Sequence, residues 1–276
     1  MIGDDTAERD EEARLLCAME PLRAPVIAAA IGALHLPPGS RGLDVGCGVG
    51  LPAMRLAEAV GPAGHVTGLD LSPRLLEHAR RLAEQAGLAE RIAFREGDMT
   101  RLPYADNSFD WLWSADCAGY GPIAEPLTLL NELERVVRPG GSVAILFWSS
   151  QMLLPGHPVL EARLNATRVG IAPFSAETAP ERHALRTLGW LRRAGLVHTW
   201  AETFVRTVFA PIEPDIREAL VALFGMRWAG GESELSGSEQ AEYRRLCQVE
   251  SPDFILNRPD YYAFFTYSLF CGQVAR

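Results

Sequence analysis

The decisive stretch of this sequence runs Gly42-Leu43-Asp44-Val45-Gly46-Cys47-Gly48-Val49-Gly50. It predicts a short strand over residues 42–46 and a helix over residues 51–60, and glycines lie at positions 46, 48 and 50 between them. Glycine tolerates positive φ angles and lets a ligand approach the backbone closely. The first turn of the following helix has N–H groups without intrahelical partners. This strand–loop–helix unit therefore predicts a ligand site at the mouth of the loop.

Strands and helices alternate around this unit. Strands are expected over residues 42–46, 65–70, 91–95, 109–113 and 142–148, and helices over residues 6–20, 21–34, 51–60, 72–87 and 124–138. Such alternation favours a doubly wound α/β fold, in which a mostly parallel sheet carries helices on both faces. Sheets of this kind bind ligands beyond the carboxyl ends of their strands.

The alternation loosens after residue 150. A helix over residues 181–194 and strands over residues 198–208 and 267–274 are still expected. The stretches 151–180 and 210–262 are longer than ordinary connections, and we expect them to form a helical lid over the substrate. The whole chain, residues 1–276, is expected to form one domain, with its cofactor-binding core at residues 40–150.

The composition excludes several functions. All 26 basic residues are arginine, so a Walker-type phosphate loop, a Schiff-base lysine and a protein-kinase lysine cannot be built. The net charge of −9 opposes non-specific binding to nucleic acid or anionic lipid. No apolar run is long enough for a membrane span. Five dispersed cysteines without a C-x-x-C pair predict reduced thiols in a cytoplasmic protein with no metal site.

The acids near the glycine loop narrow the choice of ligand. A dinucleotide fingerprint would place its third glycine at position 51, which is leucine. Asp44 would repel a pyrophosphate and favour a ligand with a positive amine. S-adenosylmethionine has an ammonium and a sulfonium group and no phosphate. Asp70, at the end of the second strand, can accept hydrogen bonds from ribose hydroxyls. Asp98, after the third strand, can accept from an adenine amino group, while Met99 or Leu71 packs on the ring.

These features resemble a known family. The matching blocks are residues 43–50, Gly68-Leu69-Asp70-Leu71-Ser72, Glu96-Gly97-Asp98-Met99, Leu102-Pro103-Tyr104 with Phe109-Asp110, and Arg135-Val136-Val137-Arg138-Pro139-Gly140-Gly141. The chain is similar over residues 40–150 to class I S-adenosylmethionine-dependent methyltransferases of the ubiquinone/menaquinone-biosynthesis-like group. The resemblance implies a Rossmann-like, seven-stranded sheet with an antiparallel last strand.

The resemblance also implies roles for individual residues. Asp44 and the loop residues Gly46, Cys47, Gly48 and Gly50 would hold the methionine end of S-adenosylmethionine. Asp70 would hold the ribose, and Asp98 and Met99 the adenine. Ser114, directly after the fourth strand, would line the cofactor near the transferable methyl group. No substrate residue can be carried over from the family.

The expected function is methyl transfer from S-adenosylmethionine to a small organic acceptor through oxygen, carbon, nitrogen or sulfur. No catalytic residue is assigned, because in-line methyl transfer needs alignment more than a general base. Trp148, His157 and Tyr261 are candidates for the substrate pocket, although we favour core packing for the aromatic residues and a structural or exposed position for the loop histidine. Two alternatives stay open: a non-catalytic S-adenosylmethionine-binding sensor or assembly protein, and an NAD(P)-dependent oxidoreductase. The sequence leaves the oligomeric state open.

Overall fold

The computed structural model describes residues 4–118, 125–170 and 180–276, and within them seven strands form one sheet in the order β3-β2-β1-β4-β5-β7-β6. The strands are β1 (Arg41–Val45), β2 (His65–Asp70), β3 (Ile92–Glu96), β4 (Phe109–Ala115), β5 (Val137–Met152), β6 (Val197–Phe209) and β7 (Tyr262–Gln273). The pairs among β1 to β5 are parallel, whereas β7 runs antiparallel to both β5 and β6. The predicted Rossmann-like sheet with an antiparallel last strand is confirmed.

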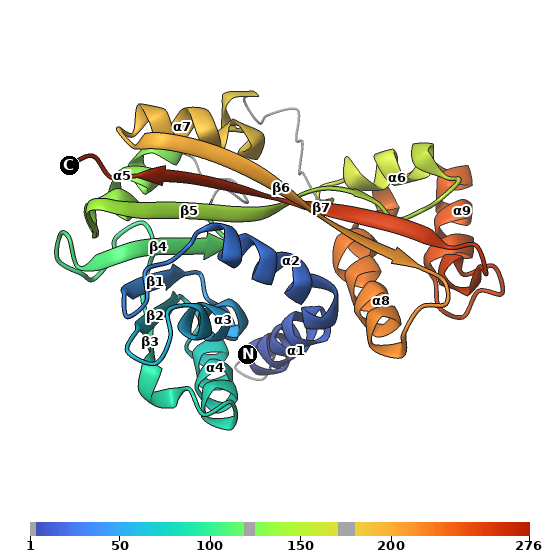
Figure 1. The fold of residues 1–276 in the computed structure, drawn as a ribbon. Helices are drawn as coiled ribbons and strands as arrows, with labels where there is room; N and C mark the ends of the chain where they lie inside the picture. Colours follow the sequence, from blue (N-terminus) through green and yellow to red (C-terminus); the bar gives the residue numbers. More distant parts are fainter. Residues whose placement is uncertain (1–3, 119–124, 171–179) are drawn as a thin grey trace.

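Helices lie on both faces of the sheet (Figure 1). They are α1 (Asp4–Ala18), α2 (Glu20–Ala33), α3 (Leu51–Ala59), α4 (Pro73–Gln85), α5 (Pro126–Arg135), α6 (Pro158–Asn165), α7 (Thr187–Arg193), α8 (Pro214–Trp228) and α9 (Gly237–Cys247), with short 3-10 turns η1 (Ala89–Arg91), η2 (Pro180–Arg182), η3 (Ala184–Arg186), η4 (Ala229–Glu234) and η5 (Ile255–Asn257). One apolar core joins α2, α3, α4 and α8 to one face, and a second joins α5 and α7 to the other.

The start of α4 shows how the sequence places the edge of the future site. Ser72 caps this helix, since its hydroxyl accepts a hydrogen bond from the Leu75 N–H at 3.4 Å. Pro73 follows at the first helical position, where a missing N–H costs nothing. The helix therefore begins directly after β2, and the Asp70 side chain lies beside its first turn.

Three predicted elements differ from the structure. The final strand, expected over residues 267–274, begins earlier, and β7 covers Tyr262–Gln273. The strand expected over residues 142–148 extends from Val137 to Met152, because a register shift after Trp148 lets β5 continue its pairing with β7. The helix expected over residues 181–194 is shorter. Residues 180–186 form the turns η2 and η3, and the helix α7 covers only Thr187–Arg193. His183 interrupts it, since its backbone is extended and its Nδ1 accepts from the Leu185 N–H at 3.2 Å.

The long strands β5, β6 and β7 extend beyond the rest of the sheet (Figure 1). Helices α6, α8 and α9 gather around their far ends, so the described parts of residues 151–180 and 210–262 form a second cluster of helices beside the core. Trp228 and Leu223 of α8 are buried in the same apolar core as Trp148 and Phe265 of the strands.

No single helix within the described ranges is long and apolar enough to cross a membrane. Two segments, Glu11–Ala18 and Glu20–Ala33, would pass such a test only as a pair, and they are bent by 64° against each other.

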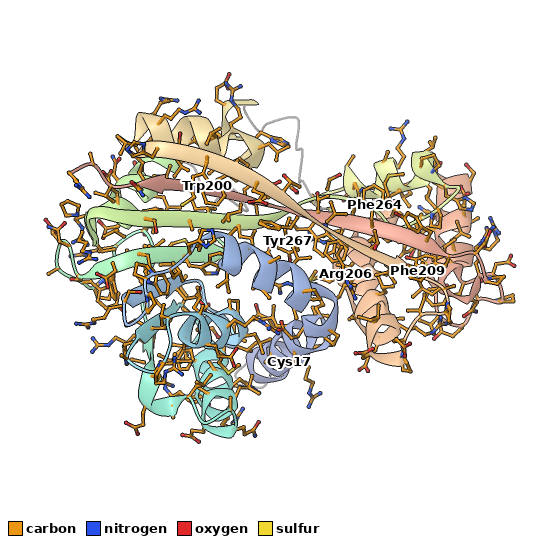
Figure 2. All side chains as sticks on the ribbon, viewed as in Figure 1. Cys17, Trp200, Arg206, Phe209, Phe264 and Tyr267 are labelled. Carbon is orange, nitrogen blue, oxygen red and sulfur yellow. The ribbon has the colours of Figure 1, made fainter. Side chains whose placement is uncertain are left out.

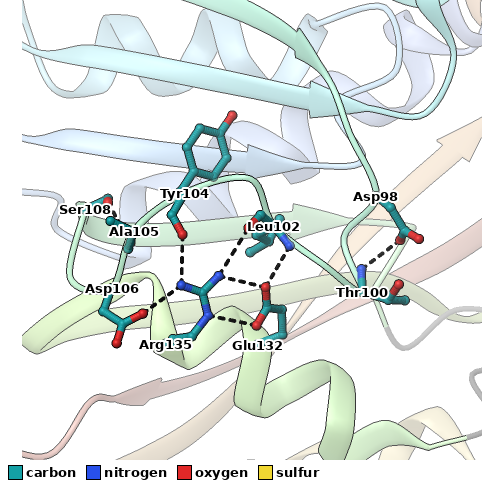
Figure 3. Close-up of polar contacts among 9 residues, drawn as sticks. All are labelled: Asp98, Thr100, Leu102, Tyr104, Ala105, Asp106, Ser108, Glu132 and Arg135. Carbon is teal, nitrogen blue, oxygen red and sulfur yellow. Dashed lines mark hydrogen bonds and ion pairs between the residues drawn. The ribbon is translucent and has the colours of Figure 1, made fainter.

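Arg135, the last residue of α5, fixes the loop that follows β3 (Figure 3). Its guanidinium donates to both carboxylate oxygens of Glu132 at 2.7 and 2.8 Å and to Asp106 at 2.8 Å. It also donates to the backbone carbonyls of Tyr104 and Leu102, while Glu132 accepts from the Leu102 N–H at 2.7 Å. This loop contains Asp98 and Met99, the residues expected to contact adenine. Arg135 therefore helps to position them through its hydrogen bonds to the backbone of the same loop.

We expect Arg135→Met to lower the free energy of unfolding by about 1–3 kcal/mol, because charge-assisted bonds to Glu132 and two carbonyls are lost together. Chemical denaturation followed by circular dichroism measures this change. Arg138→Met is the matched control, since Arg138 makes one ion pair, with Asp110, and its side chain is 58% exposed. It should cost less than about 1 kcal/mol. Equal losses for both variants would show that Arg135 does not anchor the loop.

Candidate functional site

A cleft of about 440 Å³ lies at the carboxyl ends of β1, β2 and β4. The N-terminal helices α1 and α2 form its other wall. Its lining is formed by Glu12, Leu16, Glu20, Arg23, Ile27, Gly46, Cys47, Gly48, Val49, Leu51, Pro52, Asp70, Leu71, Ser72, Leu75, Ala115, Asp116 and Cys117. This volume falls within the range of small-molecule and cofactor pockets. The cleft occupies the edge of the sheet where parallel α/β folds bind ligands.

The glycine loop forms the centre of this cleft. Gly46, Gly48 and Gly50 all have positive φ angles, of 73°, 53° and 78°. A Cβ atom on Gly46 would lie 2.6 Å from the Cβ of Cys117, so this position cannot accept a side chain without movement. The loop therefore depends on glycine for both its backbone conformation and its close packing.

Asp70 holds the loop in place. One of its carboxylate oxygens accepts the N–H of Gly48 and the other accepts the N–H of Ser72, each at 2.9 Å. The same side chain lines the cleft. A carboxylate oxygen can accept more than one hydrogen bond, so Asp70 can hold the loop and still accept from ligand hydroxyls.

Asp44 is a buried acid that finds no hydrogen-bond partner in the part of the chain that the structure describes. Its side chain lies beneath the loop with 1% exposure, and neither carboxylate oxygen has a hydrogen-bond partner among the described residues. Burial, together with the nearby charge of Asp70, raises the pKa of Asp44 to about 8. Buried polar groups are normally hydrogen-bonded, and an exception needs an explanation. An unpaired acid at this strand end fits a site whose ligand supplies a cation or a donor.

Arg23 of α2 forms a network with two residues far away in sequence. Its Nη2 donates to Asp116 at 2.8 Å and its Nε donates to the hydroxyl of Tyr267 at 3.0 Å. The Tyr267 hydroxyl in turn donates to Asp116 at 2.7 Å, and the N–H of Trp148 donates to the other Asp116 oxygen. Of the described residues that line the cleft, Arg23 alone is basic.

The comparisons with known proteins agree with this geometry. A family model described as a methyltransferase domain matches residues 43–141. Residues 43–141 therefore form a methyltransferase domain of the class I, S-adenosylmethionine-dependent type. The sequence of the chain is 35% identical over 172 residues to 27-O-demethylrifamycin SV methyltransferase of Amycolatopsis mediterranei. This matched region covers 62% of this chain and 59% of the relative. The chain is 40% identical over 119 residues to a demethylmenaquinone methyltransferase of Staphylococcus aureus, covering 42% of this chain and 46% of the relative.

A solved structure extends the comparison from the sequence to the fold of this chain. A Bacillus halodurans protein assigned as a methyltransferase superposes with a TM-score of 0.57 at 16% identity, over 90% of this chain and 99% of that one. The chain spans less than two thirds of the length of either curated relative. S-adenosylmethionine is the cofactor of this family, and an unpaired Asp44, an acid-lined cleft and a glycine loop all suit a ligand that carries an ammonium and a sulfonium.

The structure brings together some of the residues that were predicted to bind the cofactor. Gly46, Cys47, Gly48, Asp70 and Leu71 line the cleft, with Asp44 directly beneath the loop. Gly50 does not line the cleft and instead caps α3.

Three further residues of the predicted set, Asp98, Met99 and Ser114, do not line the cleft either. Asp98 is exposed, and one of its oxygens accepts the N–H of Thr100 at 2.8 Å (Figure 3). Met99 packs on the core beneath α5. Ser114 is fully buried, where its hydroxyl donates to the Val45 carbonyl at 2.9 Å and accepts from the Ala118 N–H at 3.0 Å. It ties β4 to β1 behind the cleft.

The three substrate candidates also lie away from this cleft. Trp148 stacks on Phe265 with ring centroids 4.1 Å apart, and the Tyr261 hydroxyl donates to the Leu153 carbonyl at 3.1 Å. His157 precedes α6, and its Nδ1 lies 2.6 Å from a carboxylate oxygen of Glu242 in α9. His157 was expected at the pocket mouth because it follows the fifth strand, but β5 continues to Met152 and carries this residue into the second helix cluster.

The cover of the cleft comes from the N-terminus. No described residue of 151–180 or 210–262 lines it, whereas α1 and α2 contribute five lining residues: Glu12, Leu16, Glu20, Arg23 and Ile27. An ion pair of 2.7 Å between Glu20 and Arg55 joins α2 to α3 on one side. Sequence reasoning missed Arg23 and Asp116. Asp116 had the available signal, since it is one more acid that directly follows a parallel strand.

Within the methyltransferase domain, Gly46→Ala should weaken binding of S-adenosylhomocysteine at least about tenfold. A side chain at positive φ costs about 1–2 kcal/mol, and its Cβ would also collide with Cys117. Isothermal titration calorimetry measures the affinity. Gly225→Ala in α8 is the control, because nothing lies within 4 Å of the added Cβ. An affinity unchanged in Gly46→Ala would show that the loop does not hold the cofactor.

Proposed function

We propose that this protein transfers the methyl group of S-adenosylmethionine to a small organic acceptor. The observation that carries the proposal is the charge arrangement of the cleft: Asp70 on its surface, an unpaired Asp44 beneath the glycine loop, and Arg23 as the basic lining residue. These groups match a ligand with an ammonium, a sulfonium and a carboxylate, and they would repel the pyrophosphate of a nicotinamide cofactor.

The residues divide the binding task between the two ends of the cofactor. Asp70 accepts the ribose hydroxyls, and the loop around Gly46 and Gly48 holds the methionine part above Asp44. Arg23 lies on the same cleft and is the partner for the carboxylate. Asp98 and Met99 remain our candidates for the adenine side, at the loop that Arg135 anchors. When bound, the cofactor supplies an electrophilic methyl group on a sulfonium centre.

The rest of the reaction requires alignment and exclusion of water rather than a dedicated base. Helices α1 and α2 shield the cleft, and their apolar residues Leu16 and Ile27 line it opposite Ala115. An acceptor that enters there meets these apolar side chains beside charged ones, among them Glu12, Glu20 and the Arg23–Asp116 pair. With no lysine in the chain, a base for a hydroxyl or ammonium acceptor must come from a carboxylate, histidine, tyrosine or water.

The names of the relatives support an acceptor of this kind. By their names, one methylates 27-O-demethylrifamycin SV and the other demethylmenaquinone, and in the cleft of this chain Leu16 and Ile27 offer apolar surface. We therefore propose an apolar acceptor whose methylated atom is presented at the Arg23–Asp116 cluster.

A labelled transfer assay tests this function. The purified protein would be incubated with S-adenosylmethionine carrying a radioactive methyl group and with panels of phenols, quinols and macrocyclic alcohols. We expect organic-extractable label with at least one panel and, at a limiting cofactor concentration, far less label with the Asp70→Ala variant. Binding of S-adenosylhomocysteine without transfer to any acceptor would favour the non-catalytic alternative.

A further inference from the structure

The edge strand β6 is unusually long and unprotected. It runs for 13 residues, Val197–Phe209, and among the described residues it pairs only with β7. Natural edge strands are usually shortened, covered, or guarded by proline and repeated charges. From Thr199 to Phe209, β6 has no proline and only two charged residues, Glu202 and Arg206. Its other residues are mostly valine, threonine and aromatic types that favour strands.

Apolar side chains are exposed along this strand. Val205 is 60% exposed and Phe209 is 63% exposed. Both lie on the face of β6 that turns away from α2 and α8, and Figure 2 shows Phe209 near the far end of the strand. Exposed apolar groups beside an unpaired strand edge are typical of a surface that another strand covers.

The two charges of β6, Glu202 and Arg206, have no ion-pair partner among the described residues of their own chain. Arg206 Nε is buried and has no hydrogen-bond partner among the described residues. No ion pair of Arg206 or Glu202 exists within the described part of the chain. Arg206 lies toward the far end of β6 (Figure 2), and in the strand pairing it is opposite Phe265 of β7. A partly buried guanidinium without a carboxylate indicates that a partner is missing.

The spacing of the charges identifies that partner. Glu202 and Arg206 are four residues apart, so they lie on the same face of the strand with Phe204 between them. If a second β6 pairs antiparallel about a two-fold axis through Phe204, each Glu202 lies directly opposite the other copy's Arg206. Directly opposed side chains in an antiparallel pair have Cβ atoms about 4.5–5.5 Å apart, close enough for an ion pair.

We propose that β6 is the interface of a homodimer, in which two copies of this chain pair their β6 edges antiparallel about Phe204. The two sheets then form one continuous sheet across the two-fold axis. Two equivalent Glu202–Arg206 ion pairs fix the register, as an isologous interface requires. On the opposite face Val205 lies against Thr203 of the other copy, and Phe209 against its Thr199, so each exposed apolar side chain gains a cross-strand neighbour that shields one flank from water.

Sedimentation velocity over a range of protein concentrations tests the proposal with a charge swap. The unsubstituted chain should sediment as a dimer. Glu202→Arg places arginines opposite each other and should weaken the dimer at least about tenfold, as should Arg206→Glu. The double variant Glu202→Arg with Arg206→Glu should restore the dimer, because the two charges exchange places. Glu84→Arg on the exposed face of α4 is the matched control and should leave the dimer unchanged.

Circular dichroism and binding of S-adenosylhomocysteine verify that each variant is folded. Glu202 is exposed, so its replacement should not disturb the core. Val205→Lys provides a second route, since it places a charge on the exposed edge without touching the ion pairs, and it should also give monomers. A monomeric unsubstituted chain would overturn the proposal. If Glu202→Arg is monomeric and the double variant is folded but also monomeric, the proposal is overturned as well.

Discussion

Replacing Asp70 with alanine should weaken the binding of S-adenosylhomocysteine by about 3 kcal/mol, or roughly 100-fold, the largest loss expected from any single change on the cleft surface. Two effects combine. The ribose hydroxyls lose a charged acceptor, and the N–H groups of Gly48 and Ser72 lose the carboxylate that holds them. The loop is then free to leave the conformation that fits the cofactor.

Titration calorimetry gives the affinity, with Asp260→Ala as the control. Asp260 is an exposed acid that pairs only with the nearby Arg258, and its loss should leave the affinity unchanged. Asp70→Asn should fall between the two, because its amide keeps one acceptor oxygen but presents a donor to one of the backbone N–H groups. An Asp70→Ala affinity equal to that of the parent would mean that the ribose lies elsewhere.

Asp44→Asn should produce the second large effect. It should raise the free energy of unfolding and weaken the binding of S-adenosylhomocysteine. The unfolded chain ionises Asp44 near its ordinary pKa of 3.8, whereas the folded protein keeps the proton to a pKa of about 8. Between these values the folded state binds the extra proton, so the free energy of unfolding falls as the pH rises. The asparagine variant has no such proton, and its advantage over the parent should grow from pH 4 to pH 8.

The expected advantage reaches roughly 3–5 kcal/mol at pH 8 and is flat above it. Denaturant unfolding at several pH values measures this difference. Binding should change the other way. Ionised Asp44 favours a cationic ligand, so the parent should bind S-adenosylhomocysteine more tightly at pH 8 than at pH 6. The variant should bind weakly at both. A constant stability difference across this pH range would show that Asp44 is not a buried, unpaired acid.

The part of the site predicted from sequence is the part built from local segments. Asp44, Gly46, Gly48 and Asp70 lie within two strand–loop units. Within such a unit, residues that are close in sequence also lie close together in space. Ser114 was placed at the correct strand end, but alternation along β4 turns its side chain into the core. Local patterns identify a strand end more reliably than the direction of each side chain there.

The missed parts depend on contacts between distant segments. Arg23 reaches Asp116 and Tyr267 from 93 and 244 residues away, and no periodicity in the N-terminal helices indicates that contact. The lid was expected from the long stretches after residue 150, yet α1 and α2 cover the described cleft. The length of β5 decided this outcome, since its continuation to Met152 carries His157 and Tyr261 away from the cofactor edge of the sheet.

The central claim is that the acid-lined cleft at the glycine loop binds S-adenosylmethionine and not a dinucleotide. Calorimetric titration of the purified protein with S-adenosylhomocysteine and, separately, with NADH tests it most directly. We predict saturable one-to-one binding of S-adenosylhomocysteine that Asp70→Ala weakens about 100-fold, and no heat of binding with NADH. Tight binding of NADH with no response to S-adenosylhomocysteine would contradict the claim.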